Sequence, residues 1–138
     1  MMIDMLILLL VINAAPPIVV TGFPRAARVP LDFGGRFVDD RSILGKNKTV
    51  GGFVSGVAAG GIGGLLLGFS LPLGLAAGFL GMLGDSLTSF FKRRFRFLEG
   101  ADVPVIDQLL EGGLPIAIFA SSYQLSIIEC GVLLAVFV

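Results

Sequence analysis

Five apolar segments separated by two short charged windows set the strongest limit on how this 138-residue chain can fold. Charged residues make up 14 % of the chain and hydrophobic residues 55 %, whereas soluble domains carry about 25 % charged residues. Because so few charged side chains cannot cover a globule in water, a soluble single domain is excluded. A helix needs about 20 apolar residues to cross roughly 30 Å of hydrocarbon. The apolar segments cover residues 1–20, 50–69, 72–91, 103–122 and 123–138.

All ten Lys and Arg residues fall in the two windows between these segments, at about residues 24–49 and 92–102. Cytoplasmic loops of membrane proteins are enriched in Lys and Arg, and five spans with an outside N-terminus place both windows in the cytoplasm. The sequence therefore predicts one domain, residues 1–138, that forms an all-α bundle of about five transmembrane helices in the cell membrane. A signal peptide is not favoured, because the N-terminus holds Asp4 and no basic residue.

Glycine recurs at every fourth position of the second segment, and the pattern continues in the third. On a helix this spacing leaves a groove without side chains, where another helix can approach closely. We expect close packing inside the bundle; self-association into a homo-oligomer and a groove for a lipid chain are the alternatives. The glycines are Gly52, Gly56, Gly60, Gly64 and Gly68, followed by Gly74, Gly78, Gly81 and Gly84.

The first charged window combines six cations with carboxylates, glycines, Asn47 and Thr49. A solvated loop that only sets topology would explain the cations but not this mixture. Gly45-Lys46 resembles part of a phosphate-binding P-loop, but Asp40 stands where that motif needs glycine, and no Ser or Thr follows Lys46 directly. The loop is therefore a candidate phosphate-binding segment of another kind.

Two carboxylates stand at the cytoplasmic ends of predicted helices. Asp85, Ser89 and Lys92 follow i, i+4, i+7 spacing and share one helix face. A carboxylate inside an apolar span normally faces a polar interior, and the topology places Asp107 at the same depth. Carboxylates can hold Mg²⁺ and nearby cations can hold phosphate oxygens, so we expect a polar cavity open to the cytoplasm. The alternatives are pairing of Asp85 or Asp107 with arginines, a helix-terminal role for Asp107, and a simple membrane anchor at residues 92–96.

Three motifs in this sequence resemble those of the CDP-archaeol synthases, membrane enzymes related to the CDP-diacylglycerol synthases. The similarity covers nearly the whole chain, including Asn13 and Pro16, and the chain lacks the His-containing stretch and the Lys-Asp pair of the bacterial relatives. This departure favours the ether-lipid branch. The motifs are Asp39-Asp40-Arg41 with Gly45-Lys46-Asn47-Lys48-Thr49, then Gly84-Asp85-Ser86-x-x-Ser89-Phe90-x-Lys92-Arg93-Arg94, and Pro104-x-x-Asp107-Gln108.

The resemblance implies Mg²⁺-dependent transfer of CMP from CTP to 2,3-di-O-geranylgeranylglycerol 1-phosphate, giving CDP-archaeol and pyrophosphate. The implied partners are CTP, the lipid phosphate and membrane lipid, and no nucleic acid is expected. The catalytic candidates are Asp85, Lys92, Arg93 and Asp107, with the two aspartates as metal ligands. The candidates for substrate binding are Arg41, Lys46, Asn47, Lys48, Thr49, Ser89, Arg94 and Gln108.

The composition agrees with this chemistry. A chain with no His and one Cys has no obvious general base near neutral pH. Nucleotidyl transfer to a phosphate monoester needs none, because the nucleophile is already an anion and the main requirement is charge neutralisation. The alternatives are a small channel or transporter, which would place ionisable groups near the bilayer midplane, a non-catalytic scaffold, and a CDP-diacylglycerol synthase acting on ester lipids.

Overall fold

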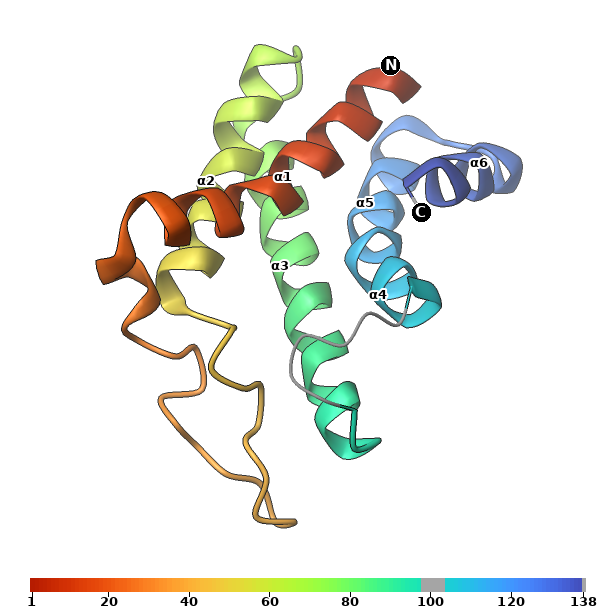
Figure 1. Ribbon diagram of the computed structural model, residues 1–138. Helices are drawn as coiled ribbons and strands as arrows, with labels where there is room; N and C mark the ends of the chain where they lie inside the picture. The colour runs from red at the N-terminus through yellow and green to blue at the C-terminus, as the bar shows by residue number, and fades with distance from the viewer. Residues whose placement is uncertain (98–103, 138) are drawn as a thin grey trace.

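The structure is a computed structural model that describes residues 1–97 and 104–137, and within these residues all regular elements are helices (Figure 1). The all-α prediction is therefore confirmed for the described residues. The chain runs through α1 (Met2–Gly22), the short 3₁₀ helix η1 (Pro24–Ala27), α2 (Val50–Leu66), α3 (Leu71–Arg94), α4 (Pro104–Glu111), α5 (Gly113–Tyr123) and α6 (Ile127–Phe137).

Two helices, α1 and α3, are long and apolar enough to cross a membrane, and α2 and α6 are shorter apolar helices. The predicted segment 103–122 contains two helices, because α4 ends at Glu111 and α5 begins at Gly113. Adjacent glycines weaken a helix, and Pro115 has no N–H to donate to the carbonyl of Glu111. Residues 98–102 of the second charged window lie outside the described residues, as do residues 103 and 138.

The glycine repeat brings α2 and α3 together at the level of their backbones. A Cβ atom at Gly60 would lie 2.5 Å from the carbonyl oxygen of Gly74 and 2.7 Å from the Cα of Gly78. The expectation of close packing inside the bundle is thus confirmed. Gly68 has another role, since its φ of +85° lets the chain turn after α2 and the N–H of Phe69 bonds the carbonyl of Gly64 at 2.8 Å.

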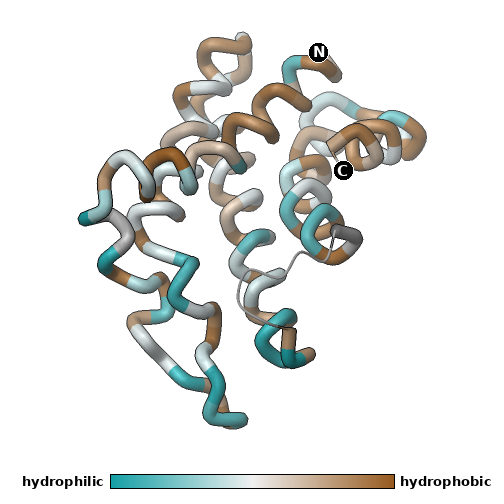
Figure 2. The backbone as a smooth tube through the Cα atoms, in the orientation of Figure 1, coloured by the Kyte–Doolittle hydropathy of each residue, from teal (hydrophilic) through white to brown (hydrophobic). Residues whose placement is uncertain are grey.

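The apolar core lies where α1 packs against α2, α3 and α6. Met5, Leu8, Leu9 and Ile12 of α1 are buried there, and Phe119 of α5 is buried in the same cluster. Figure 2 shows hydrophilic residues gathered at one end of the molecule, along the loop between η1 and α2 and at the end of α3. The candidate site is therefore sought where this loop meets the helices.

Candidate functional site

The carboxylate of Asp32 organises the loop before α2. It accepts the N–H groups of Gly34 at 3.0 Å, Leu44 at 2.9 Å and Gly45 at 3.3 Å. Burial raises the pKa of Asp32, but these N–H groups stabilise the ionised form more strongly and hold its pKa below the usual value. Gly45 sits at φ +94°, a conformation that suits glycine. The loop thereby folds back toward its own start.

The last residues of the loop run back to the start of α2 and include three predicted site residues, Asn47, Lys48 and Thr49. The N–H of Leu31 bonds the carbonyl of Lys48 at 2.7 Å, and the N–H of Val50 bonds the carbonyl of Val29 at 3.0 Å. Thr49 is buried and caps α2, because its Oγ1 accepts the N–H of Gly52 at 3.1 Å. The backbone of Asn47-Lys48-Thr49 is therefore fixed beside the helix bundle.

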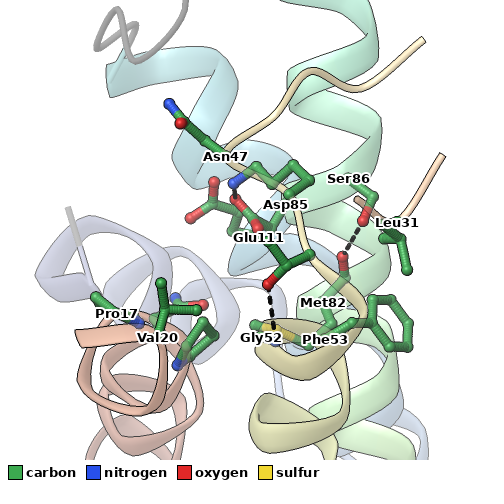
Figure 3. Close-up of a pocket in the computed structure, with 14 residues that line it drawn as sticks. Pro17, Val20, Leu31, Asn47, Gly52, Phe53, Met82, Asp85, Ser86 and Glu111 are labelled. Atoms are coloured by element: carbon green, nitrogen blue, oxygen red, sulfur yellow. Dashed lines mark hydrogen bonds and ion pairs between the residues drawn. The ribbon is translucent and has the colours of Figure 1, made fainter. Parts of the chain in front are cut away.

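A cavity of about 260 Å³ opens at this junction (Figure 3). It takes residues from α1, the loop, α2, α3 and α4, so it joins the charged end of the molecule to the apolar bundle. Its lining residues are Asn13, Pro16, Pro17, Val20, Leu31, Asn47, Lys48, Thr49, Gly52, Phe53, Met82, Asp85, Ser86 and Glu111.

Two carboxylates from different helices face this cavity. Asp85 of α3 forms an ion pair with the Nζ of Lys48, and both side chains are about three-quarters buried. Glu111, the last residue of α4, lies beside Asp85, close enough for the two carboxyl groups to interact (Figure 3). Gly84 permits this approach, because a Cβ atom there would overlap the carbonyl group of Leu110.

Asp107 has a different partner. Its carboxylate pairs with the Nζ of Lys92 at 2.7 Å, and both side chains are more than four-fifths buried. The ion pair joins α3 to α4, and neither residue belongs to the cavity lining. Each predicted metal ligand thus has a lysine partner. The alternative considered from the sequence was an ion pair with neighbouring arginines.

Arg94, at the end of α3, contacts the tip of the loop. Its guanidinium donates to the carbonyl of Ser42 at 2.8 Å and pairs with Asp39 at 3.0 Å. It also lies 4.8 Å from the ring centroid of Phe37 and 5.0 Å from that of Phe90. A second hydrogen bond runs from the loop to α3, where the guanidinium of Arg41 donates to the carbonyl of Arg93 at 3.3 Å. These contacts fasten the loop tip to α3.

Replacing Arg94 by Ala is expected to release the loop tip and speed chymotrypsin cleavage after Phe37 by about tenfold or more. The lost stacking and charge-assisted hydrogen bonds contribute about 2 kcal/mol together. Cleavage is followed by mass spectrometry, with Arg28→Ala, an exposed cation of the same loop, as the control. Cleavage at the wild-type rate, combined with weaker nucleotide binding, would instead assign Arg94 to substrate binding.

The cavity thus gathers four of the predicted site residues: Asn47, Lys48, Thr49 and Asp85. Lys46 is exposed on the loop, and Ser89, Arg93 and Gln108 are half-buried; none of these four lines the cavity. From the sequence, Glu111 could either cap a polar pocket or face the lipid headgroups, and the structure places it on the cavity. The contribution of α1 to the site was not predicted. The spacing of Asn13, Pro16, Pro17 and Val20 as i, i+3, i+4 and i+7 was the available signal.

The donor set fits a magnesium ion held partly by its substrate. No group of three or more potential metal-ligating side chains occurs in residues 1–97 and 104–137. Mg²⁺ is commonly bound through one or two carboxylates, with phosphate oxygens and waters completing its shell. Asp85 and Glu111 supply two carboxylates on one cavity wall, which meets that requirement.

In the described residues, a bundle of apolar helices encloses a cavity where carboxylates meet a basic loop, and this arrangement is that of a helical membrane protein. A model of the CDP-archaeol synthase (CarS-like) family matches residues 2–73 and 64–138, and the chain belongs to this family.

Curated relatives agree with this assignment. The chain is 43 % identical over 86 residues to a CDP-archaeol synthase of Methanopyrus kandleri, covering 58 % of this chain and 50 % of the relative. It is 37 % identical over 101 residues to the CDP-archaeol synthase of Staphylothermus marinus, and this match covers 69 % of this chain and 54 % of the relative. It is 33 % identical over 126 residues to the CDP-archaeol synthase of Sulfurisphaera tokodaii, and this match covers 87 % of this chain and 72 % of the relative. The chain thus spans about half the length of the first two relatives.

A solved structure, described as that of an intramembrane enzyme for archaeal membrane lipids biosynthesis, has the same fold. It superimposes with a TM-score of 0.76 at 28 % identity, and the match covers 98 % of this chain and 86 % of the other. This similarity and the apolar helices α1 and α3 confirm the prediction of an all-α membrane protein.

Proposed function

We propose that this protein transfers CMP from CTP to an archaeal ether-lipid phosphate, releasing pyrophosphate and forming CDP-archaeol. The observation that carries the proposal is the cavity, where Lys48 and Asp85 meet at the junction of a basic loop and an apolar bundle. A water-soluble nucleotide can reach it from the loop, and a lipid phosphate can reach it from the membrane. Family membership supports the same reaction.

The reaction needs charge neutralisation more than proton transfer. An oxygen of the lipid phosphate attacks the α-phosphorus of CTP, a new P–O bond forms, and the bond to the departing pyrophosphate breaks. Lys48 at the cavity, with the exposed Lys46 beside it in the chain, would bind the phosphate oxygens. Asn47 and Thr49 would donate hydrogen bonds. The predicted roles of Lys92, Arg93, Ser89 and Gln108 stay predictions.

Asp85 and Glu111 would hold a Mg²⁺ ion, which when bound neutralises charge on the transferring phosphate groups. In this proposal Glu111 takes the place beside Asp85 that sequence reasoning gave to Asp107. Asp107 would then act through Lys92, by fixing that cation at the end of α3. The assignment of Asp107 as a direct ligand remains the alternative and is tested below.

The proposed orientation places the loop and the cavity in the cytoplasm, with the N-terminus and the α2–α3 turn outside. Single cysteines at Ser70 and Val38, both exposed, in a Cys130→Ser background test it. A membrane-impermeant maleimide is expected to label Ser70→Cys on intact cells and Val38→Cys only after permeabilisation. The reverse pattern would show that the topology is inverted.

The activity is tested with purified protein, CTP labelled at the α-phosphate, Mg²⁺ and one of two lipids. Digeranylgeranylglyceryl phosphate is expected to give a labelled CDP-lipid and pyrophosphate in equal amounts. Preference for a diacyl phosphatidic acid would show that the substrate is an ester lipid rather than an ether lipid. No labelled lipid with either substrate, together with ion flux in proteoliposomes, would replace the enzyme proposal by a channel or transporter.

A further inference from the structure

One face of α1 forms a wall of the cavity. Asn13, Pro16, Pro17 and Val20 all line the cavity, and their spacing puts them on a single side of the helix. Figure 3 shows Pro17 and Val20 on α1, across from Asp85 and Glu111. The charged groups of the cavity therefore lie on the loop, α3 and α4, while α1 offers a wall without charge.

This uncharged wall still carries unused hydrogen-bonding groups. The chain stays helical from Met2 to Gly22 through both prolines. The carbonyl of Asn13 would bond the N–H of residue 17 or 16, but both are prolines and have none. The side-chain amide of Asn13 is half-buried and makes no hydrogen bond within the described part of the chain. In a membrane interior such groups need partners, and the cavity is where a partner can enter.

We propose that this face of α1 selects the base of the bound nucleotide, an inference that rests on the proposed function. The free carbonyl of Asn13 accepts a hydrogen bond from the exocyclic amine of cytosine. The amide group of Asn13 donates to the ring nitrogen or the carbonyl oxygen of the base. Uracil carries a carbonyl oxygen in place of the amine, so two acceptors would face each other and binding would weaken.

Pro17→Ala tests the carbonyl while leaving the Asn13 side chain in place. The new N–H lies four residues after Asn13 and closes the missing helical hydrogen bond, so the helix is expected to be at least as stable. The ratio of kcat/KM for CTP over UTP should fall by about tenfold or more. A purely structural role of Pro17 would leave this ratio unchanged.

Asn13→Leu removes the amide while keeping the branched shape and the number of side-chain heavy atoms, and it should raise KM for CTP and lower the same ratio. Pro72→Ala is the matched control, because Pro72 lies exposed in the first turn of α3, away from the cavity. It should leave the ratio unchanged. Wild-type discrimination in both Pro17→Ala and Asn13→Leu would overturn the inference.

Calorimetric binding of CTP and UTP separates this inference from the proposed reaction. If purified protein binds CTP more tightly than UTP, and both variants reduce that preference, the base-reading role stands even where no transfer to lipid is detected. Equal binding of the two nucleotides by the wild-type protein would reject the base-reading role, whatever the turnover assay shows.

Discussion

Asp85→Asn should fold normally and transfer CMP about a thousandfold more slowly than the wild-type protein. The substitution keeps size and hydrogen bonding but removes the negative charge that a hard cation requires. Loss of a few kcal/mol of charge stabilisation in the transition state corresponds to about three orders of magnitude in rate. The measurement is the rate of CDP-lipid formation at several Mg²⁺ concentrations, with folding checked by gel filtration in detergent.

Two further carboxylate variants show which group shares the cation with Asp85. Glu111→Gln should lose activity to a similar extent and need more Mg²⁺ for its residual rate. Asp107→Asn should be milder and insensitive to Mg²⁺, because the structure gives its carboxylate to Lys92 outside the cavity lining. The reverse ranking would restore Asp107 as the direct ligand. Near-normal activity of Asp85→Asn at low Mg²⁺ would show that Asp85 is not a metal ligand and only pairs with Lys48.

The second large effect is expected at Gly60, where α2 and α3 touch through their backbones. Gly60→Ala should lower the melting temperature by about 10 °C, and Gly60→Leu should prevent isolation of a folded protein. The contacting groups, the carbonyl of Gly74 at 2.5 Å and the Cα of Gly78 at 2.7 Å from the added Cβ, are backbone and cannot rotate away. The helices must therefore separate. The measurement is thermal unfolding in detergent.

Gly131→Ala is the matched control, because Gly131 is also inside a helix but an added Cβ meets no atom within 4 Å. Ala is favoured over Gly in helices by about 0.5–1 kcal/mol, so this variant should be as stable as the wild type or slightly more so. A Gly60→Leu protein that melts near the wild-type temperature would contradict the close approach of α2 and α3.

Local patterns in the sequence predicted the helices and one of their contacts. Segment length and hydropathy predicted α1 and α3. The four-residue glycine spacing predicted close helix packing, which the structure places between α2 and α3. The division between α4 and α5 was not predicted, since an apolar window averages over Gly112 and Gly113. The Gly-Gly-Leu-Pro sequence there was a local signal of the break.

The candidate site was predicted less completely, because its contacts join distant parts of the chain. Asp85 was identified from its cost inside an apolar helix, but its pairing with Lys48 depends on how the loop folds around Asp32. The topology predicted that Asp107 lies at the same depth as Asp85, but which side chain reaches the cavity from α4 depends on the rotation of that helix. That residue is Glu111.

The small size of Gly84 also has a consequence for the charges in the cavity. Because no Cβ stands there, α4 can approach α3, and the carboxyl groups of Asp85 and Glu111 lie beside each other. Lys48 is the one cation among the described residues that line the cavity. Two neighbouring carboxylates repel each other unless a cation balances their charge. A larger side chain at Gly84 would push the two helices apart and so weaken the attraction of the cavity for a second cation.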